Sequence, residues 1–435
     1  MKLYDFQTEV LEQSKDLNKV AYYFDMGTGK TFIGAEKLVR LNARINLVVC
    51  QKSKIKDWDD HFVNHYELSQ EAMIYDLTMW NKKDWESFNN DVQFENDWHE
   101  AKKYILIINY DLLFRRPELA KLKDFTLLLD ESSLIQNEQS KRTKFILNKL
   151  KPANIILLSG TPTGGKYEKL WSQLYLLGYK ISKSTYWNEY VNYYVDDRFG
   201  FPLKVIKGYK NVERLKRKMA EHGCFFKKTE EVFSLPEQQF INVNVPASKE
   251  YKKFHKTGIV KINEYETLIG DTTLTKLLYE RQLCGMDSKE KIKALKDLLS
   301  SSEDRFIIFY NFNRELITIK EICLDLDKPT SLVNGNVKDL TKYENESNSV
   351  TLIQYQAGAM GLNLQKANKI IYFTPPLSSE LFEQSKKRTH RIGQTKPCFY
   401  YQLICTNSVE ENIYFNLAKR QDYTEKLFEK EMSNG

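Results

Sequence analysis

Glycine, proline and cysteine are all scarce in this chain of 435 residues, which contains 18, 10 and 6 of them. The few glycines and prolines exclude a collagen-like chain and a largely disordered one, because both classes are rich in these residues. No two cysteines form a Cys-x-x-Cys pair, and no histidine lies at a metal-ligand spacing from a cysteine. We therefore expect buried, reduced thiols and no structural zinc.

Long apolar runs are also missing. The longest ones, such as 104–108, are far shorter than the about 20 residues that span a bilayer, and Asp5 stands where a secretory signal would be apolar. These features predict a cytoplasmic protein that is not secreted and has no membrane association. The many lysines, asparagines and tyrosines are typical of an AT-rich genome, which indicates a bacterial or phage-infected host cell.

The residues that are present favour a folded protein with more than one domain. Hydrophobic residues make up 42% and aromatic residues 13% of the chain, which is ample material for cores. At about 150 residues per domain, the length corresponds to roughly three domains. Lysine and arginine exceed aspartate and glutamate by 7 charges. This modest basic excess is compatible with a polyanionic partner but does not require one.

Two series of short, nearly continuous apolar runs alternate with amphipathic helical stretches, which is typical of parallel sheets covered by helices on both faces. We predict strands at 20–24, 46–50, 104–110, 127–130 and 155–159, and then at 306–311, 331–334, 350–355, 369–373 and 400–404. The fold class is therefore α/β with two lobes, 1–180 and 286–435. Between them, 181–285 is predicted to be a mostly helical insert and connector, because 211–221 and 273–284 have helical spacing and many charges.

A glycine-containing loop at 25–31 (Asp-Met-Gly-Thr-Gly-Lys-Thr) follows a predicted strand and opens a predicted helix over 31–41. A phosphate-binding loop requires this context, because glycines let backbone amides approach phosphates at a helix N-terminus. Phe24 stands where the general pattern has glycine, so a plain turn is the alternative. We expect Gly27, Thr28, Gly29, Lys30 and Thr31 to bind the nucleotide, with Lys30 on the β- and γ-phosphates and the Thr31 hydroxyl on Mg²⁺.

About a hundred residues later, a predicted apolar strand ends in Asp130 and Glu131. At the carboxyl edge of a parallel sheet, Asp130 would hold Mg²⁺ through water and Glu131 would orient the attacking water. A solvated acid pair at a strand end is the alternative. The phosphate-binding loop with Lys30, earlier in the chain, favours the metal site over this alternative.

The order of these strings resembles the core of superfamily-2 helicases and, more narrowly, the Swi/Snf-type (remodeller-like) translocases. The match in the first lobe includes strings similar to the adenine-reading Q motif and to motifs Ia, Ib and III. They are residues 3–7 (Leu-Tyr-Asp-Phe-Gln), 51–53 (Gln-Lys-Ser, with Trp58 behind them), Asn109 with Tyr110, and 159–162 (Ser-Gly-Thr-Pro).

The second lobe carries the most specific part of the resemblance. Residues 358–365 resemble motif V, and 384–394 reproduce the Q-x-x-x-R-x-H-R-I-G-Q string of motif VI. The resemblance implies two tandem RecA-like lobes. One departure is that Ser132 and Ser133 follow the acid pair where this group usually has Ala-His, which questions the coupling between ATP and motif III.

The resemblance also implies a set of functional residues. Catalysis would need Lys30, Asp130 and Glu131 from the first lobe, and Arg388 and Arg391, three apart on a helix, from the second. Surface salt bridges are the alternative for these arginines. Further nucleotide contacts would come from Gln7, on the adenine edge, and from Gly361 and Asn363.

Contacts to nucleic acid are implied near the motifs that lie between the catalytic ones. The residues expected there are Lys52, Ser53, Asn109, Tyr110, Gly160, Thr161, Tyr310, Asn311 and Gly358. Arg115 and Arg116 are either a further contact or a solvated turn. Small and polar residues suit contacts to the phosphate backbone, so binding should be independent of base sequence.

The expected function is that of a DNA-dependent ATPase, using ATP and Mg²⁺, that translocates along DNA with duplex favoured, in repair, recombination or replication. Other replication or repair proteins are expected partners. The alternatives are a strand-separating DNA or RNA helicase, and an ATP-gated scaffold or motor subunit of a larger complex.

Overall fold

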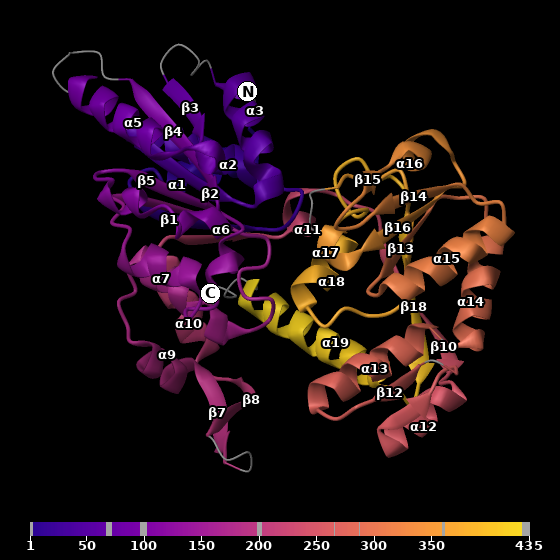
Figure 1. The fold of residues 1–435 in the computed structure, drawn as a ribbon. Coiled ribbons are helices and arrows are strands. Elements are labelled where there is room, and N and C mark those ends of the chain that lie inside the picture. Colours follow the sequence, from indigo (N-terminus) through magenta and orange to yellow (C-terminus); the bar gives the residue numbers. More distant parts are fainter. Residues whose placement is uncertain are drawn as a thin grey trace, which may run out of the picture. The chain divides into compact units, whose positions relative to one another are not determined.

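The computed structural model describes residues 3–66, 72–95, 102–197, 202–264, 266–286, 288–358 and 362–428. The chain forms two compact units (Figure 1). Unit 1 comprises Met1–Val232 with Tyr423–Gly435, and unit 2 comprises Phe233–Asp422. The division falls inside the expected connector 181–285, and the predicted domain boundaries stay predictions.

Unit 1 is built on a seven-stranded sheet in which every neighbouring pair is parallel. The strand order is β3-β4-β2-β5-β6-β1-β9. The strands are β1 Lys19–Phe24, β2 Ile45–Cys50, β3 Ala72–Asp76, β4 Lys103–Asn109, β5 Thr126–Asp130, β6 Asn154–Leu158 and β9 Cys224–Lys227. The strands predicted for the first lobe are confirmed, while β3 and β9 were not expected.

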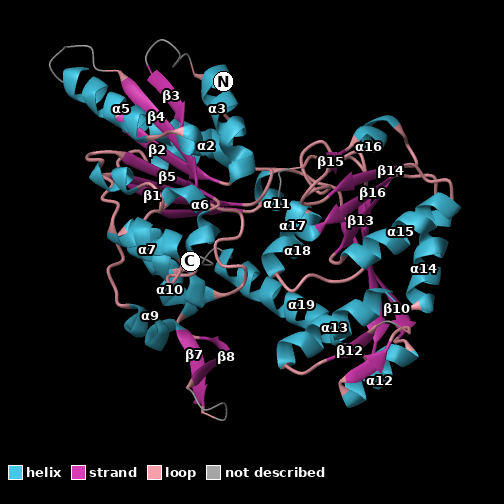
Figure 2. Ribbon diagram, in the orientation of Figure 1, coloured by secondary structure: helices cyan, strands magenta, loops and turns pink. Residues whose placement is uncertain are grey.

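Helices cover both faces of this sheet (Figure 2). They are α1 Asp5–Gln13, α2 Lys30–Leu41, α3 Ile55–His65, α5 Lys82–Glu95, α6 Tyr110–Leu113, α7 Lys141–Asn148, α8 Trp171–Leu177, α9 Lys183–Tyr190, α10 Val212–Glu221 and α11 Thr229–Val232. Short 3₁₀ turns include η1 Lys52–Lys54 and η4 Ser132–Ile135.

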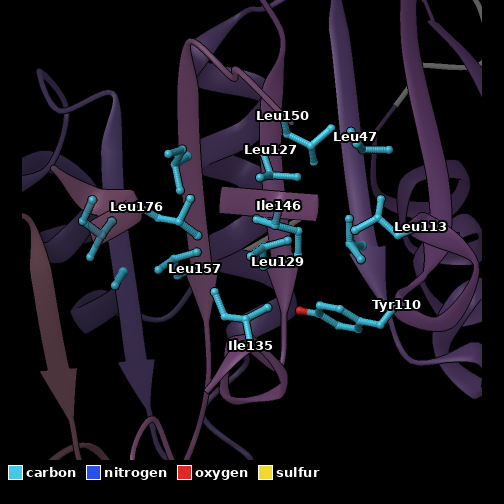
Figure 3. Close-up of a cluster of buried hydrophobic side chains, with 14 of the residues drawn as sticks. Leu47, Tyr110, Leu113, Leu127, Leu129, Ile135, Ile146, Leu150, Leu157 and Leu176 are labelled. Atoms are coloured by element: carbon cyan, nitrogen blue, oxygen red, sulfur yellow. The ribbon is translucent and has the colours of Figure 1, made fainter. Parts of the chain in front are cut away.

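Alternation along the strands produces two hydrophobic cores in unit 1. Leu127 and Leu129 of β5 point into one cluster, part of which Figure 3 shows. Leu128 points into the other. Successive strand residues face opposite sides of a sheet, so the uninterrupted apolar run of β5 is buried on both faces. Helix α2 lies close to β6, because a Cβ on Gly34 would meet Leu158 at 2.6 Å.

Unit 2 has its own seven-stranded sheet, in the order β10-β18-β17-β13-β16-β14-β15. All neighbours are parallel except β14 and β15. The strands are β10 Gln238–Pro246, β13 Phe306–Tyr310, β14 Thr330–Val333, β15 Lys338–Asp339, β16 Val350–Gln354, β17 Lys369–Tyr372 and β18 Cys398–Thr406. The helices are α12 Lys249–Thr257, α13 Thr273–Met286, α14 Lys289–Ser300, α15 Asn313–Asp325, α16 Thr341–Asn345, α17 Tyr355–Gly358, α18 Ser379–Lys386 and α19 Val409–Phe428.

Two parallel-sheet units confirm the predicted α/β class with two RecA-like lobes. The stretch 181–285 contains the expected helices but also strands, and two of these, β9 and β10, complete the main sheets. These are edge strands with many exposed or half-buried residues, so they lack the continuous apolar pattern of the central strands. The same stretch contains a separate hairpin, β7 Val191–Asp196 with β8 Leu203–Tyr209, and a small pair, β11 Ile259–Lys261 with β12 Thr267–Ile269. No helix in the described part of the chain is long and apolar enough to cross a membrane.

Candidate nucleotide and nucleic-acid sites

The phosphate loop lies between the end of β1 and the start of α2. Gly27 and Gly29 have φ angles of 85° and 76°, in the left-handed region that favours glycine. A Cβ on Gly29 would also lie only 2.6 Å from the Gln7 side-chain nitrogen. Lys30 Nζ donates to the carbonyls of Phe24 and Asp25, at 3.0 and 3.1 Å. The loop therefore has the backbone form that brings amides and a lysine to a phosphate.

Gln7 supports this loop from helix α1. Its Nε2 donates to the carbonyls of Thr28 and Gly29, at 2.9 and 3.1 Å, and its Oε1 accepts from the backbone amide of Tyr4 at 3.0 Å. The side chain is only 1% exposed. Gln7 thus joins the N-terminal helix to the loop, and its expected bond to adenine stays a prediction.

The other side of the loop is held by a segment that the sequence did not single out. The backbone amide and the hydroxyl of Thr229 both donate to Asp25 Oδ2, at 3.2 and 3.3 Å. The Asp25 amide donates to the carbonyl of Lys227, at the end of β9, at 3.0 Å. Thr229 is fully buried. The only available signal was the short aromatic run at 224–227, within a stretch that was expected to be helical.

Asp130, the candidate Mg²⁺ ligand, lies at the carboxyl end of β5. Trp58 of α3 donates its indole N–H to Asp130 Oδ2 at 2.9 Å. Burial raises the pKa of Asp130, while the Trp58 hydrogen bond and the charge of Lys30 act in the opposite direction. Asp130 pairs with Leu158 of β6, and Leu158 pairs with Tyr22 of β1, so the two halves of the predicted phosphate and metal site lie at the same edge of the parallel sheet.

The backbone beside Asp130 is strained. Glu131 has a φ angle of 53°, which is uncommon for a residue other than glycine and recurs at functional sites. The Tyr110 hydroxyl donates to the carbonyl of Asp130 at 2.8 Å. Two aromatic side chains, Trp58 and Tyr110, therefore hold the side chain and the main chain of the same acid.

Ser132 joins motif II to motif III through Gln173 of α8. The Ser132 hydroxyl donates to Gln173 Oε1 at 2.7 Å, and Gln173 Nε2 donates to the carbonyl of Pro162 at 2.8 Å. The Tyr23 hydroxyl donates to the same Oε1 at 3.0 Å. All three side chains are fully buried. The serine at this position therefore still forms a physical link to motif III, through a glutamine that no sequence motif indicated.

The remaining predicted residues of the first site lie beside these. A Cβ on Gly160 would approach Lys30 Nζ to 3.2 Å, which places motif III next to the phosphate lysine. The Thr28 hydroxyl donates to the carbonyl of Asp25 at 2.7 Å and is engaged within the loop. Thr31 is half-buried in the first turn of α2. This donor set, with a glycine loop, a lysine, a hydroxyl and a half-buried carboxylate, fits Mg²⁺ and a triphosphate.

Arg388 and Arg391 lie in unit 2 but not on a helix, so that prediction is wrong. Helix α18 ends at Lys386, and the Arg391 amide donates to the carbonyl of Thr389, which is a turn. The carbonyl of Arg388 accepts from the Leu364 amide at 3.0 Å. Arg388 is 3% exposed. Burial lowers the pKa of Arg391.

Motif VI packs on motif V through side chains as well. Arg391 donates to the carbonyl of Leu362 at 3.4 Å, and Gln394 Nε2 donates to the carbonyl of Ala367 at 2.9 Å. His390 Nε2 lies 2.8 Å from the carbonyl of Pro236, which ties the turn to the start of unit 2. Asn363 is exposed. Gly361 lies outside the described residues, so its predicted role stays a prediction.

The predicted nucleic-acid contacts divide into exposed and buried residues. Lys52 and Ser53 are exposed in η1. Asn311 is half-buried, and its amide is bonded to Thr374. Gly358 ends α17. The others are buried: Asn109, Tyr110, Gly160, Thr161 and Tyr310.

Two of these residues carry rings that lie in the hydrophobic cores, and all the predicted contacts to nucleic acid stay predictions. The rings of Tyr110 and Tyr310 belong to the hydrophobic cores of their units, with 2% and 0% exposed. They therefore offer no surface to a nucleic acid in this structure. Tyr110 acts instead on the backbone of Asp130.

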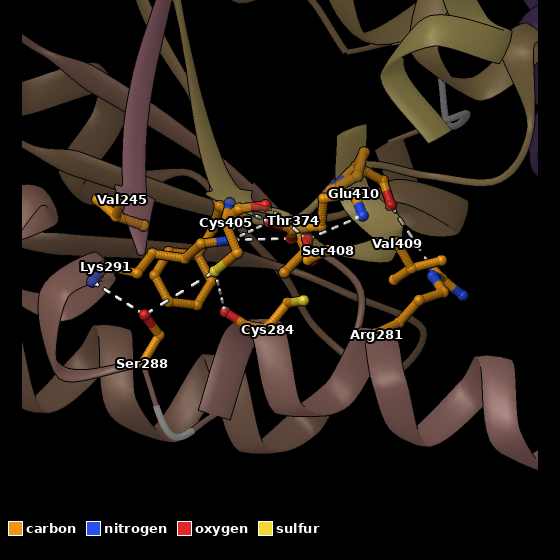
Figure 4. Close-up of polar contacts among 12 residues, drawn as sticks. Val245, Arg281, Cys284, Ser288, Lys291, Thr374, Cys405, Ser408, Val409 and Glu410 are labelled. Carbon is orange, nitrogen blue, oxygen red and sulfur yellow. Dashed lines mark hydrogen bonds and ion pairs between the residues drawn. The ribbon is translucent and has the colours of Figure 1, made fainter. Parts of the chain in front are cut away.

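A buried polar cluster in unit 2 bears on the expectation that there is no structural zinc. Ligand atoms of Cys284, Cys405 and Glu410 lie within 4.8 Å of one another. The carboxylate of Glu410, however, accepts two bonds from Lys291 Nζ, at 2.8 and 2.7 Å, with both side chains at most 1% exposed (Figure 4). The lysine ammonium thus already supplies the positive charge that this carboxylate requires. The pair joins α14 to α19.

Comparison with known proteins gives the family. The SNF2-related domain matches residues 20–293, and the helicase conserved C-terminal domain matches residues 290–393. The chain belongs to the SNF2-related family. The resemblance drawn from the motifs is therefore confirmed.

Individual relatives of this SNF2-related chain are distant. It is 25% identical to a probable ATP-dependent DNA helicase, CHR12 of Arabidopsis thaliana, over 94% of this chain and 40% of the relative. It is 23% identical to a putative ATP-dependent helicase/translocase, YwqA of Bacillus subtilis, over 72% of this chain and 37% of the relative. The chain thus spans about two fifths of the length of these relatives.

One solved structure among the matches is the Sulfolobus solfataricus SWI2/SNF2 ATPase core in complex with dsDNA. It shares 19% identity with this chain at a TM-score of 0.44, and the match covers 98% of this chain and 92% of that one.

Proposed function

We propose that this chain is a DNA-stimulated ATPase that translocates along duplex DNA. The observation that carries the proposal is the position of the Lys30 loop and Asp130 at one edge of the unit 1 sheet, in a chain that also has the arginine-containing turn of a helicase C-terminal domain. Membership of the SNF2-related family supports it. ATP and Mg²⁺ are the proposed cofactors.

The proposed roles follow from the chemistry of each side chain. The loop amides and Lys30 would bind the phosphates, while Thr31 and Asp130 would hold the metal, which neutralises charge on the phosphates when bound. Glu131 would orient the attacking water. Arg388 and Arg391 would stabilise the transition-state charge, an effect typically of 10³–10⁵ in rate. Movement of one RecA-like lobe against the other during this cycle would advance the chain along DNA.

The direct test is ATP hydrolysis measured in parallel without nucleic acid and with single-stranded DNA, duplex DNA, forked DNA and RNA. We expect the largest stimulation with duplex DNA, and an effect that falls with salt because contacts to phosphates release counterions. Turnover indifferent to duplex DNA would refute the substrate. Displacement of a strand from a partial duplex would favour the alternative, a strand-separating helicase.

Two substitutions separate nucleotide binding from hydrolysis. Lys30→Ala should abolish hydrolysis and greatly weaken nucleotide binding, because it removes the ammonium of the phosphate loop. Arg391→Ala should lower the hydrolysis rate on the order of 10³-fold but leave nucleotide binding nearly unchanged. Rapid-quench turnover and binding of a fluorescent ATP analogue measure the two effects.

Arg314→Ala is the control for the arginine. Its guanidinium pairs with Glu266 on the surface of unit 2 and should have no effect on turnover. A fully active Arg391→Ala variant would refute the assignment of an arginine finger.

The cellular setting of this activity is also proposed. We propose a cytoplasmic location in a bacterial or phage-infected host cell, with other replication or repair proteins as partners. Localisation of a tagged chain during infection or growth tests this.

A further inference from the structure

The β7–β8 hairpin is not part of either main sheet. It forms a separate two-stranded sheet and projects from the α9 and α10 side of unit 1 (Figures 1 and 2). Its base is anchored, because Tyr209 stacks on Tyr167 at a centroid distance of 4.3 Å and donates its hydroxyl to Glu168 at 2.7 Å. Further along, apolar side chains are exposed, with Tyr194 at 41% and Leu203 at 42%. An isolated two-stranded ribbon buries little apolar surface, so these exposed side chains have no core of the hairpin to pack into.

Lysine ammonium groups are held in place on this ribbon by aromatic rings. Lys204 Nζ lies 4.5 Å from the ring centroid of Tyr193 and 5.0 Å from that of Trp187. Lys207 Nζ lies 4.9 Å from the ring centroid of Tyr194. A ring attracts a cation but does not neutralise it, so these contacts order a flexible side chain and leave its full charge outward.

These lysines have no acidic partner in the described part of the chain. The cations of the following helix are different, because Arg214, Lys216 and Lys218 each pair with a glutamate. Neither Lys204 nor Lys207 takes part in any ion pair of the described residues. The described hairpin also carries two acids, Asp196 and Asp197, but neither forms an ion pair with Lys204 or Lys207, so both ammonium groups stay unpaired among the described residues.

The two lysines lie on opposite faces of the ribbon. The pairing register shifts opposite Asn192 and Tyr193, at Lys207, so the ring contacts and not the pairing place this lysine. Lys204 lies over the ring of Tyr193 and Lys207 over the ring of Tyr194, and these tyrosines are successive residues of β7, whose side chains point to opposite sides of the ribbon. A two-stranded ribbon fits the major groove of duplex DNA, which is about 12 Å wide and has a phosphate backbone on each side. With one ring-bound lysine on each face, the ribbon would direct one ammonium group to the phosphate backbone on each side of the groove.

We propose that the β7–β8 hairpin is a nucleic-acid contact that enters the major groove of a duplex, with Lys204 directed to one phosphate backbone and Lys207 to the other. The contact is independent of base sequence, because ammonium groups on phosphates position a duplex without distinguishing its bases. This inference rests on the proposed function and specifies which surface, outside the helicase motifs, holds the duplex. A protein partner that pairs with the hairpin edges is the competing occupant.

The test is the salt dependence of duplex binding by the full chain. A variant Lys204→Gln/Lys207→Gln loses two phosphate contacts, each of which contributes about 0.9 to the slope of log K against log salt. The slope should therefore fall in magnitude by about 1.8, and affinity at 0.1 M salt should fall roughly tenfold or more. The probe is a fluorescent duplex of mixed sequence, titrated at several salt concentrations without nucleotide.

Two further variants make the result specific. Lys82→Gln/Lys83→Gln removes the same charge from exposed positions on α5 and should leave the slope unchanged. Lys204→Arg/Lys207→Arg keeps the charge and should bind like the original chain. Hydrolysis of ATP without DNA should be equal in all of them, which shows that each is folded.

The outcomes separate the two proposals. If the original chain neither binds the duplex nor hydrolyses ATP faster in its presence, the proposed function fails, and the hairpin proposal fails with it. If the original chain binds duplex in a salt-sensitive way and the hairpin variant has the same slope as the α5 control, the function stands and the hairpin proposal is overturned.

Discussion

A single indole N–H orients the acid that is proposed to hold Mg²⁺. Trp58 is 1% exposed and follows η1, where the exposed Lys52 and Ser53 lie. Its bond to Asp130 favours the ionised carboxylate, against the burial that favours the neutral form. Trp58 is thus a positioning residue, because it acts on the metal through Asp130.

We predict that Trp58→Phe makes hydrolysis more dependent on Mg²⁺ and on pH. Without the indole donor the pKa of Asp130 rises, so more of the carboxylate is protonated at mildly acidic pH and the acid limb of the rate profile moves to higher pH. Loss of a partner that orients a metal ligand typically weakens metal affinity 10–100-fold. Rates measured against Mg²⁺ concentration and pH test this. Saturating Mg²⁺ at alkaline pH should restore most of the rate.

Trp85→Phe is the matched control, because Trp85 is also buried in unit 1 and its Nε1 has no hydrogen-bond partner in the described part of the chain. It should leave the dependence on Mg²⁺ unchanged. Equal behaviour of the two variants would mean that loss of packing, not of the hydrogen bond, explains any change.

At the scale of elements, helix α15 begins on a buried carboxylate. Glu315 Oε2 accepts the amides of Asn311 and Phe312, at 2.8 and 3.1 Å, and Oε1 accepts the Thr374 hydroxyl at 3.0 Å. Helix α13 closes over it, since a Cβ on Gly285 would lie 2.3 Å from Oε1. Burial raises the pKa of Glu315 from 4.5 to about 7, in spite of these donors. The Glu315 carboxyl, which lies where β13, α15 and the end of β17 meet, therefore titrates near neutral pH.

We predict that this carboxylate makes the stability of unit 2 depend on pH. The folded pKa lies above the unfolded one, so its contribution to stability is complete below pH about 4.5 and is lost as pH rises to about 7. The loss is on the order of 3 kcal/mol, from about 1.4 kcal/mol for each pH unit. Glu315→Gln, which keeps an acceptor without the charge, should remove this dependence in urea unfolding at several pH values. Glu321→Gln, on the exposed face of the same helix, should retain it.

At the scale of the whole molecule, each unit has its own sheet and its own hydrophobic clusters. Units of this kind unfold as separate cooperative blocks. The nucleotide loop belongs to unit 1 alone, whereas the arginine-containing turn belongs to unit 2. Nucleotide binding to the loop should therefore stabilise unit 1, while the unfolding of unit 2 should be a separate event.

We predict two transitions in calorimetry, of which a non-hydrolysable MgATP analogue raises the unit 1 transition. At a hundred times its dissociation constant the analogue contributes about 2.7 kcal/mol, which corresponds to roughly 5–10 °C for a unit of this size. Lys30→Ala should remove the shift. Glu315→Gln should alter only the other transition. A single transition that carries the enthalpy of the whole chain would contradict this division.

Much of the fold and part of the site could be predicted from the chain itself. The central strands were found because continuous apolar runs such as 127–129 have one stable environment, a sheet covered on both faces. The edge strands β3 and β9 were missed because their half-exposed residues carry no such pattern. The turn holding Arg388 and Arg391 was taken for a helix, because a spacing of three between the arginines does not reveal that α18 ends at Lys386.

The sequence by itself determined the family, the α/β class and the identity of the phosphate loop and the acid pair, since these depend on local strings whose backbone geometry glycine and strand propensity dictate. Only the tertiary structure decided which distant groups support them. Trp58 meets Asp130 across 72 positions, and Thr229 meets Asp25 across 204. Such contacts form because parallel strands end at one edge of a sheet, which brings together residues that no local pattern connects.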